Sequence, residues 1–133
     1  MAAVDEVADY LASVEGLSAR RLTHAEWGIT IPGASVGGEP IEAGLRIADG
    51  LLRVQAIALH AAGDLDPWML LWWNRQTRLV RFGCTRSQDI WVHADIPVSD
   101  ADERGVDRVL GLITEAVVAV RGHAAGARAA RSQ

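Results

Sequence analysis

The sequence concentrates its bulk in residues 66–96, which read DPWMLLWWNR at 66–75, LVRFGC at 79–84 and DIWVHADI at 89–96. Of the five tryptophans, all except Trp27 lie in this stretch. Because one buried aromatic ring removes roughly 150 to 250 Å² from water, the composition predicts the centre of the core, an association surface, or both.

Asp66 and Pro67 predict the start of a helix, with the aspartate as N-cap and the proline at the first helical position. The predicted helix ends at about Gln76. Its bulky apolar residues occupy both sides, with one set at Trp68, Leu71 and Trp72 and the other at Met69, Leu70 and Trp73. A helix that is apolar all round requires burial on both sides, and this one is too short to span a membrane. We therefore expect the core on one side and a further surface on the other.

Two strands are predicted next, at residues 79–84 and 89–96. In the second strand, aliphatic side chains alternate with Trp91, His93 and Asp95, so the aliphatic face is expected to meet the helices.

The first half of the chain predicts a helix over residues 4–14 and one half-buried strand over residues 22–31, where apolar residues recur at every second position. An Asp-Gly pair at positions 49–50 separates two apolar runs and is typical of a type I′ turn. Residues 45–48 and 51–59 are therefore predicted to form a hairpin.

The last helix is predicted to begin near Asp100, because Glu103 follows at the spacing of a capping box. Its apolar stripe extends to about Arg121 and comprises Val106, Val109, Leu110, Ile113, Val117 and Val120. Residues 122–133 contain alanine, glycine and arginine without a pattern, which predicts a disordered C-terminal tail. Residues 1–121 are then expected to form a single domain.

Composition excludes several classes of function. Half of the 133 residues are apolar and 23% are charged, as in soluble globular proteins, and no targeting or membrane-spanning segment is expected. The net charge of -4 provides no basic field for nucleic acid. All 13 basic residues are arginine, which is typical of a GC-rich bacterial genome.

Cys84 is the only cysteine, which excludes an internal disulfide and fits a reducing cytoplasm. Alternation places it on the same strand face as Val80 and Phe82. A small buried thiol is therefore favoured over a reactive one.

No catalytic, cofactor or metal site is predicted. His93 and Asp95 lie two residues apart on one strand face, but no nucleophile motif such as G-x-S-x-G accompanies them. A solvated polar strand face is favoured over an acid–base pair. The four histidines are too scattered for a zinc signature.

Arginines gather beside the tryptophans, a combination typical of interface hot spots, at Arg75, Arg78, Arg81 and Arg86. Pairing with acids of this chain, such as Asp89 and Asp95, or across a dimer is favoured over an external acidic ligand.

The predicted order of elements, α-β-β-β-α-β-β-α, describes an α+β fold with a five-stranded antiparallel sheet. Together with LVRFGCTRSQDIWVHADIP at residues 79–97, this order resembles the YbjN family of bacteria, which shares the type III secretion chaperone-like fold. The resemblance covers residues 4–121. It implies that the first and last helices pack on one face of the sheet and that the middle helix lies at a two-fold dimer interface. It carries no catalytic residues.

The favoured hypothesis is a non-enzymatic, cytoplasmic, homodimeric module of a bacterium that binds a partner polypeptide, with no cofactor, nucleic acid or membrane partner. The predicted dimer or partner interface comprises Trp68, Met69, Trp72, Trp73 and Arg75. The possible partner surface comprises Arg78, Arg81, Trp91 and His93. One alternative is a small-molecule sensor or enzyme with a pocket between sheet and helices, lined by Trp27, Trp91 and His93. The other is a subunit of a regulatory or secretion complex.

Overall fold

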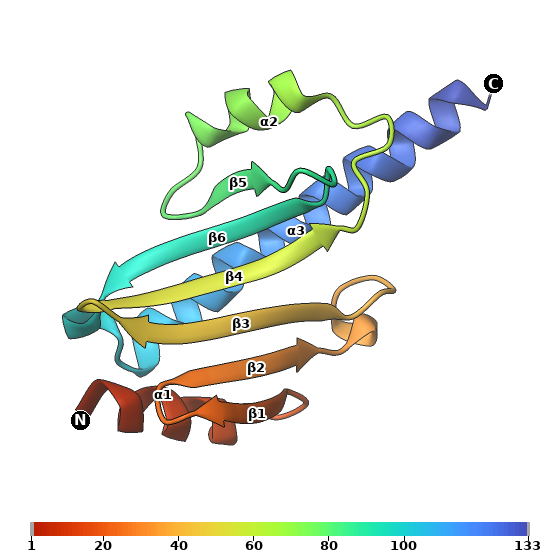
Figure 1. The fold of residues 1–133 in the computed structure, drawn as a ribbon. Coiled ribbons are helices and arrows are strands. Elements are labelled where there is room, and N and C mark those ends of the chain that lie inside the picture. The colour runs from red at the N-terminus through yellow and green to blue at the C-terminus, as the bar shows by residue number, and fades with distance from the viewer. Residues whose placement is uncertain (1, 133) are drawn as a thin grey trace.

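The structure is a computed structural model that describes residues 2–132 as an α+β fold with a six-stranded antiparallel sheet (Figure 1). In chain order the helices and strands are α1 (Ala2–Ser13), β1 (Ser18–Thr23), β2 (Glu26–Ile31), β3 (Ile41–Ala48), β4 (Leu51–Leu59), α2 (Pro67–Asn74), β5 (Arg81–Cys84), β6 (Ile90–Pro97) and α3 (Glu103–Arg131). Short 3-10 turns lie at Gly33–Ser35 and Val98–Asp100.

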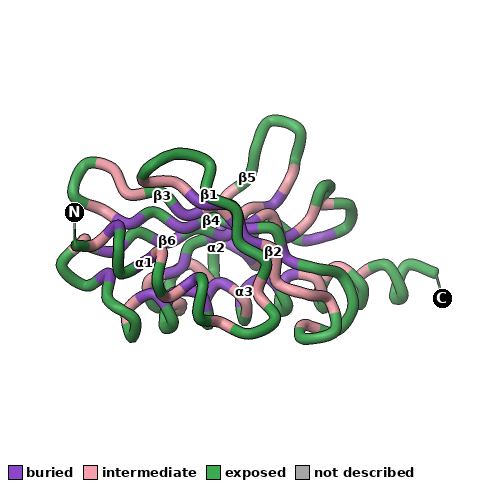
Figure 2. Tube along the Cα trace, turned by 90° about the horizontal axis from the view of Figure 1, so that it is seen from below, coloured by how far each residue is buried: buried purple, intermediate pink, exposed green. Residues whose placement is uncertain are grey.

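The strands follow the order β1-β2-β3-β4-β6-β5 across the sheet, so β1 and β5 are its edges. Helices α1 and α3 pack on one face, as the resemblance implied, and leave the other face open to solvent (Figures 1 and 2). Helix α2 lies beside the β5 edge (Figure 1). The open face and the two edges therefore present three different surfaces.

The prediction of five strands is wrong, because residues 18–31 form a hairpin of two strands, β1 and β2. His24 and Ala25 make its turn without a positive φ, and neither is a residue type that marks a tight turn. Side chains stabilise this turn instead. The Arg21 guanidinium donates to the carbonyl of His24 at 2.6 Å, and the Thr23 hydroxyl accepts from the backbone N–H of Ala25 at 3.3 Å.

The hairpin predicted from the Asp-Gly pair is confirmed. Asp49 and Gly50 have φ values of 55° and 77° and join β3 to β4, which are paired throughout the region next to the turn. Positive φ at both central residues is the signature of a type I′ turn, whose twist matches that of the strands.

The core lies between the sheet and helices α1 and α3. In β6, Val92 is fully buried while its neighbour His93 is exposed, which confirms the predicted alternation. The predicted stripe of α3 is buried at every position, namely Val106, Val109, Leu110, Ile113, Val117 and Val120. An 18-residue window of α3 has a mean hydropathy of 1.3, so the helix is long and apolar enough to span a membrane, and its buried stripe packs on the sheet.

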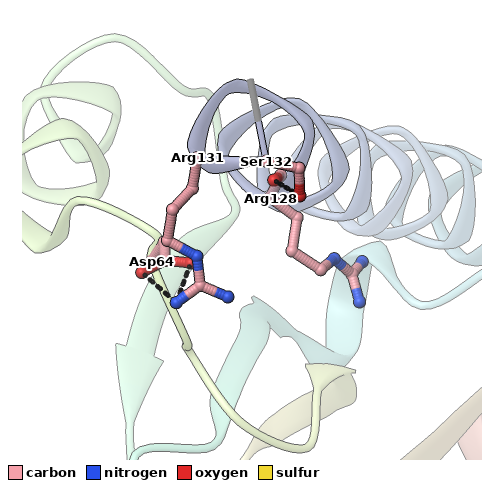
Figure 3. Close-up of polar contacts among 4 residues, drawn as sticks. All are labelled: Asp64, Arg128, Arg131 and Ser132. Carbon is pink, nitrogen blue, oxygen red and sulfur yellow. Dashed lines mark hydrogen bonds and ion pairs between the residues drawn. The ribbon is translucent and has the colours of Figure 1, made fainter.

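Both ends of α3 differ from the prediction. Its N-cap is Asp102, whose carboxylate accepts from the backbone N–H of Gly105 at 2.8 Å, whereas Asp100 belongs to the preceding 3-10 turn. At its C-terminus the helix continues past Arg121 to Arg131. Figure 3 shows Arg131 reaching back to Asp64, with Nη1 and Oδ2 at 3.2 Å, while Arg128 points away. The domain boundary at residue 121 remains a prediction.

Arg121 joins α3 to two separate segments of the sheet side. Its guanidinium donates to three backbone carbonyls, those of Ala58 at 3.1 Å, Glu39 at 2.8 Å and Pro40 at 3.0 Å. The residue at the predicted end of the helix therefore fixes the loop before β3 and the end of β4.

Candidate functional site

Helix α2 begins as the sequence predicts. The Asp66 carboxylate accepts from the backbone N–H of Trp68 at 2.9 Å, and Pro67 occupies the first turn. Leu70 is the buried residue of this helix. Trp73 is half-buried, with its ring 5.5 Å from the ring of Phe82 and 4.8 Å from that of His123. These contacts define the side of α2 that belongs to the core.

The other side of α2 is exposed. The exposed fractions are 76% for Trp68, 57% for Leu71 and 59% for Trp72, all large apolar side chains. Large tryptophan surfaces that remain in water on a folded chain are typical of association sites. We call these three residues the α2 apolar surface.

The residues predicted for the interface therefore divide into two groups. Trp68, Trp72 and Arg75 are exposed, whereas Met69 and Trp73 are half-buried and pack against the chain's own core. Leu71, which the sequence analysis did not select, joins the exposed group. Helical spacing predicts that Leu71 shares a side of the helix with Trp68. Spacing alone does not predict which side of the helix faces β5.

Asn74, at the end of α2, closes the β5 edge. Its side-chain oxygen accepts from the backbone N–H of Phe82 at 2.8 Å, and its side-chain nitrogen donates to the Phe82 carbonyl at 3.2 Å. One amide side chain thus satisfies both backbone groups of a residue in an edge strand. In the sequence, an asparagine in the last turn of a predicted helix is too common a feature to have identified this role.

The β1 edge has no such cover. All six residues of β1 are exposed, and within the described residues 2–132 the strand pairs only with β2. An edge strand presents a row of backbone N–H and C=O groups on its outer side, which is a template for pairing with another chain. The β1 edge is therefore a second candidate surface.

The expected pairing of the arginine cluster with Asp89 and Asp95 of its own chain is not formed within residues 2–132, and pairing across a dimer stays a prediction. Among residues 2–132 the ion pairs join Arg53 to Asp95 at 3.2 Å and Arg131 to Asp64. Arg81 instead donates to the carbonyls of Thr77 at 3.1 Å and Val80 at 2.7 Å. Within the described chain, no ion pair involves Arg75, Arg78 or Arg86.

Trp91 and His93 lie on the open face of the sheet, since they alternate with the buried residues of β6. Trp91 is half-buried and its indole Nε1–H is buried without a hydrogen-bond partner in the described chain. His93 and Trp27 border a groove on this open face, to which Trp91 does not contribute. The predicted pocket lined by all three between sheet and helices is therefore not formed.

Cys84 is exposed, so the prediction of a buried thiol is wrong. It is the last residue of β5, where the strand leaves the core, and alternation no longer determines burial there. Within residues 2–132 no group of three His, Cys, Asp or Glu side chains is arranged to hold a metal ion. The carboxylate of Asp95 is engaged by Arg53 rather than by His93.

Comparisons with known proteins gave matches only to solved structures. No family model matches the chain, and no curated protein matches it. A chain of the HopA1–SchA chaperone–effector complex is 14% identical with a TM-score of 0.70, covering 89% of this chain and 91% of that one. The Yersinia pestis type III secretion chaperone SycH, in complex with a fragment of YscM2, is 15% identical with a TM-score of 0.61, covering 90% and 97%.

A third similar structure is the ExsC–ExsE complex, with 13% identity and a TM-score of 0.50 over 77% of this chain and 71% of that one. Structural similarity at such low sequence identity establishes the fold and leaves the activity open. The chain has the fold of the type III secretion chaperones.

Proposed function

We propose that this chain is a non-enzymatic, chaperone-like protein that forms a homodimer through α2 and binds a partner polypeptide. The observation that carries the proposal is the α2 apolar surface, with Trp68 76% and Trp72 59% exposed. Burying about 500 Å² of such surface would contribute on the order of 12 kcal/mol as an upper estimate at about 25 cal/mol per Å². A second copy is the simplest occupant, because a two-fold axis would place the same apolar helix of each copy against the other.

Two further observations support a polypeptide as partner. The β1 edge is open for strand addition, in which main-chain hydrogen bonds supply affinity. The similar structures include a chaperone–effector complex and a secretion chaperone with a bound fragment of YscM2. A cytoplasmic location and a relationship to the YbjN family, based on residues 79–97, belong to the same proposal.

The dimer is tested by light scattering after size-exclusion chromatography at micromolar concentration. The wild-type chain is expected at twice its 14.3 kDa mass. Trp72→Glu should halve that mass without unfolding, because the side chain is 59% exposed in the single chain. Leu22→Glu is the matched control, since Leu22 is 56% exposed at the opposite edge of the sheet and should leave the mass unchanged.

A wild-type chain that is monomeric at this concentration would remove the dimer from the proposal. Partner binding is tested separately by hydrogen exchange on the complex isolated from the native host. Slower exchange of the β1 amides on binding is expected, and protection confined to other strands would contradict the use of this edge.

A further inference from the structure

The open face of the sheet contains a groove of about 450 Å³ that crosses β1, β2, β3, β4 and β6. Its side-chain lining is mostly polar and exposed, in contrast to the aliphatic face on the other side of the same strands. The residues whose side chains line it from the open face are Leu22, Glu26, Arg46, Arg53, Gln55, His93 and Asp95. None of these residues takes part in the α2 surface.

Gly44 forms part of the floor of the groove, and Gly28 lies beside it under the Arg20 side chain. Gly28 in β2 and Gly44 in β3 lie directly opposite each other in register, inside their strands. Neither has a positive φ, so backbone conformation does not require glycine at either position. A Cβ atom on Gly44 would meet no atom within 4 Å, whereas one on Gly28 would lie 3.1 Å from the Arg20 guanidinium. Glycine inside a strand weakens it and often marks a close approach by a ligand or another backbone.

Two arginines lie beside this floor, and only one of them has an ion pair within residues 2–132. Arg46 lies directly opposite Arg53, and like charges in that position destabilise a sheet. Asp95 engages Arg53 at 3.2 Å, but Arg46 has no ion pair or side-chain hydrogen bond among residues 2–132. Glu26 is opposite Arg46 in register and yet does not approach it within 4 Å.

We propose that this groove binds an acidic segment of a partner polypeptide, with one carboxylate between Arg46 and Arg53 and the segment's backbone over Gly44. The proposal rests on the protein-binding function proposed above and adds the chemistry of the segment. A carboxylate placed between the two guanidiniums would accept charge-assisted hydrogen bonds and relieve their repulsion. Because Glu26 and Asp95 flank the arginines and the chain has a net charge of -4, the groove suits a carboxylate among mixed charges better than a phosphate backbone.

The test is an NMR titration of the full chain with a synthetic hexaglutamate peptide, following backbone amides and arginine Nε–H groups. Saturable shifts are expected at Gly44, Arg46 and Arg53, and they should weaken with added salt. Arg46→Gln should raise the dissociation constant about fivefold. Arg108→Gln is the matched control, because Arg108 is an exposed arginine on α3 outside the groove and should leave the constant unchanged.

A second variant distinguishes a loss of binding caused by a filled groove from one caused by unfolding. Gly44→Val should fill the hollow above β3, where a Cβ meets nothing within 4 Å, and a β-branched residue suits a strand. The variant is therefore expected to melt at or above the wild-type temperature while losing hexaglutamate binding.

Absence of shifts at millimolar peptide, or equal loss of binding in Arg46→Gln and Arg108→Gln, would overturn the proposal. Stronger shifts of the same groove with a thymidine decanucleotide would assign it to nucleic acid instead. The result is independent of dimerisation and of the β1 edge, which are measured by molar mass and by hydrogen exchange on the native complex. Failure of one proposal is thus distinguishable from failure of the other.

Discussion

The two edge strands of the sheet are terminated in different ways. At β5, helix α2 lies over the edge, Asn74 bonds the backbone of Phe82, and Trp73 packs on the Phe82 ring. At β1, every residue is exposed and no strand within residues 2–132 pairs with the outer side. The chain therefore closes one edge itself, with an apolar helix whose outer side is uncovered, and leaves the other edge open.

Charge protects the open edge from indiscriminate pairing. Arg20 and Arg21 lie within β1, and charged side chains on an edge strand discourage aggregation. The Arg21 guanidinium lies 5.4 Å from the centre of the Trp27 ring, which holds part of this charge against the sheet. If the proposed strand addition occurs at this edge, we expect the partner strand to bring negative charge.

The largest expected effect comes from removing the contact that holds α2 on β5. Phe82→Ala should lower the free energy of unfolding by about 3 kcal/mol, because Phe82 is 7% exposed and packs against Trp73. Leu22→Ala on β1 should change it by no more than about 0.5 kcal/mol. Urea denaturation at one fixed protein concentration measures both, and equal losses would refute the difference between the edges.

A smaller effect is expected from the polar closure of β5. Asn74→Ala should lower the free energy of unfolding by about 1.5 kcal/mol, because the backbone N–H and C=O of Phe82 lose their partners. Faster hydrogen exchange at the Phe82 amide distinguishes this loss from a general destabilisation. Asn74→Asp is the control for the N–H bond, since a carboxylate still accepts from that group. Unchanged exchange at Phe82 in the alanine variant would contradict the assigned role.

Removing the C-terminal end of α3 should lower the free energy of unfolding by about 1 kcal/mol, because contacts on the β5 side are lost. A chain that ends at Arg121 loses the stacking of His123 on Trp73 and the ion pair of Arg131 with Asp64. It should remain folded, in agreement with a domain of residues 1–121. Circular dichroism and a melting curve provide the measurement. A chain that no longer folds would place the boundary further along the helix.

The smallest effect is expected at the β1 end, where Tyr10 of α1 donates to the Asp107 carboxylate of α3 at 2.5 Å. Burial, aided by Asp107, raises the pKa of the Tyr10 phenol well above its usual range. The resulting stabilisation is present below the unfolded pKa of about 10 and is lost as the pH rises through the folded pKa. Tyr10→Phe should lower the free energy of unfolding by about 0.5 kcal/mol at neutral pH.

The pH dependence gives a specific readout for this contact, because the chain has one tyrosine and no lysine. In wild type, the urea midpoint should decline above pH 10, and ultraviolet absorbance should show tyrosinate forming late. The decline should be shallower in Tyr10→Phe. Identical profiles in the two proteins would mean that the phenol keeps its usual pKa.

Much of the fold could be predicted because local chemistry and global packing agree. The Asp49-Gly50 turn, the Asp66 cap and the apolar stripe of α3 each have a sequence signal and an observed counterpart. The turn at His24 and Ala25 could not be predicted, because its stabilising groups are ordinary side chains of Arg21 and Thr23. Alternation continued through that turn and so imitated one long strand.

The candidate surfaces were only partly predictable. The composition of α2 predicted an association surface, but which side faces β5 depends on the tertiary placement of Trp73. The groove on the open face was missed, although Gly28 and Gly44 are a usable signal once the register of β2 and β3 is known. Single-strand alternation cannot supply that register, because it depends on the pairing of different segments.

The three carbonyl contacts of Arg121 have a consequence for the order in which the chain folds. The β3–β4 hairpin is local and can form early, whereas Arg121 meets Glu39 and Pro40 across separations of 82 and 81 residues. Contacts of such separation form only after the chain between them has been closed, which makes them slow. We expect the loop before β3 to be among the last parts of the molecule to order, after α3 has docked on the sheet.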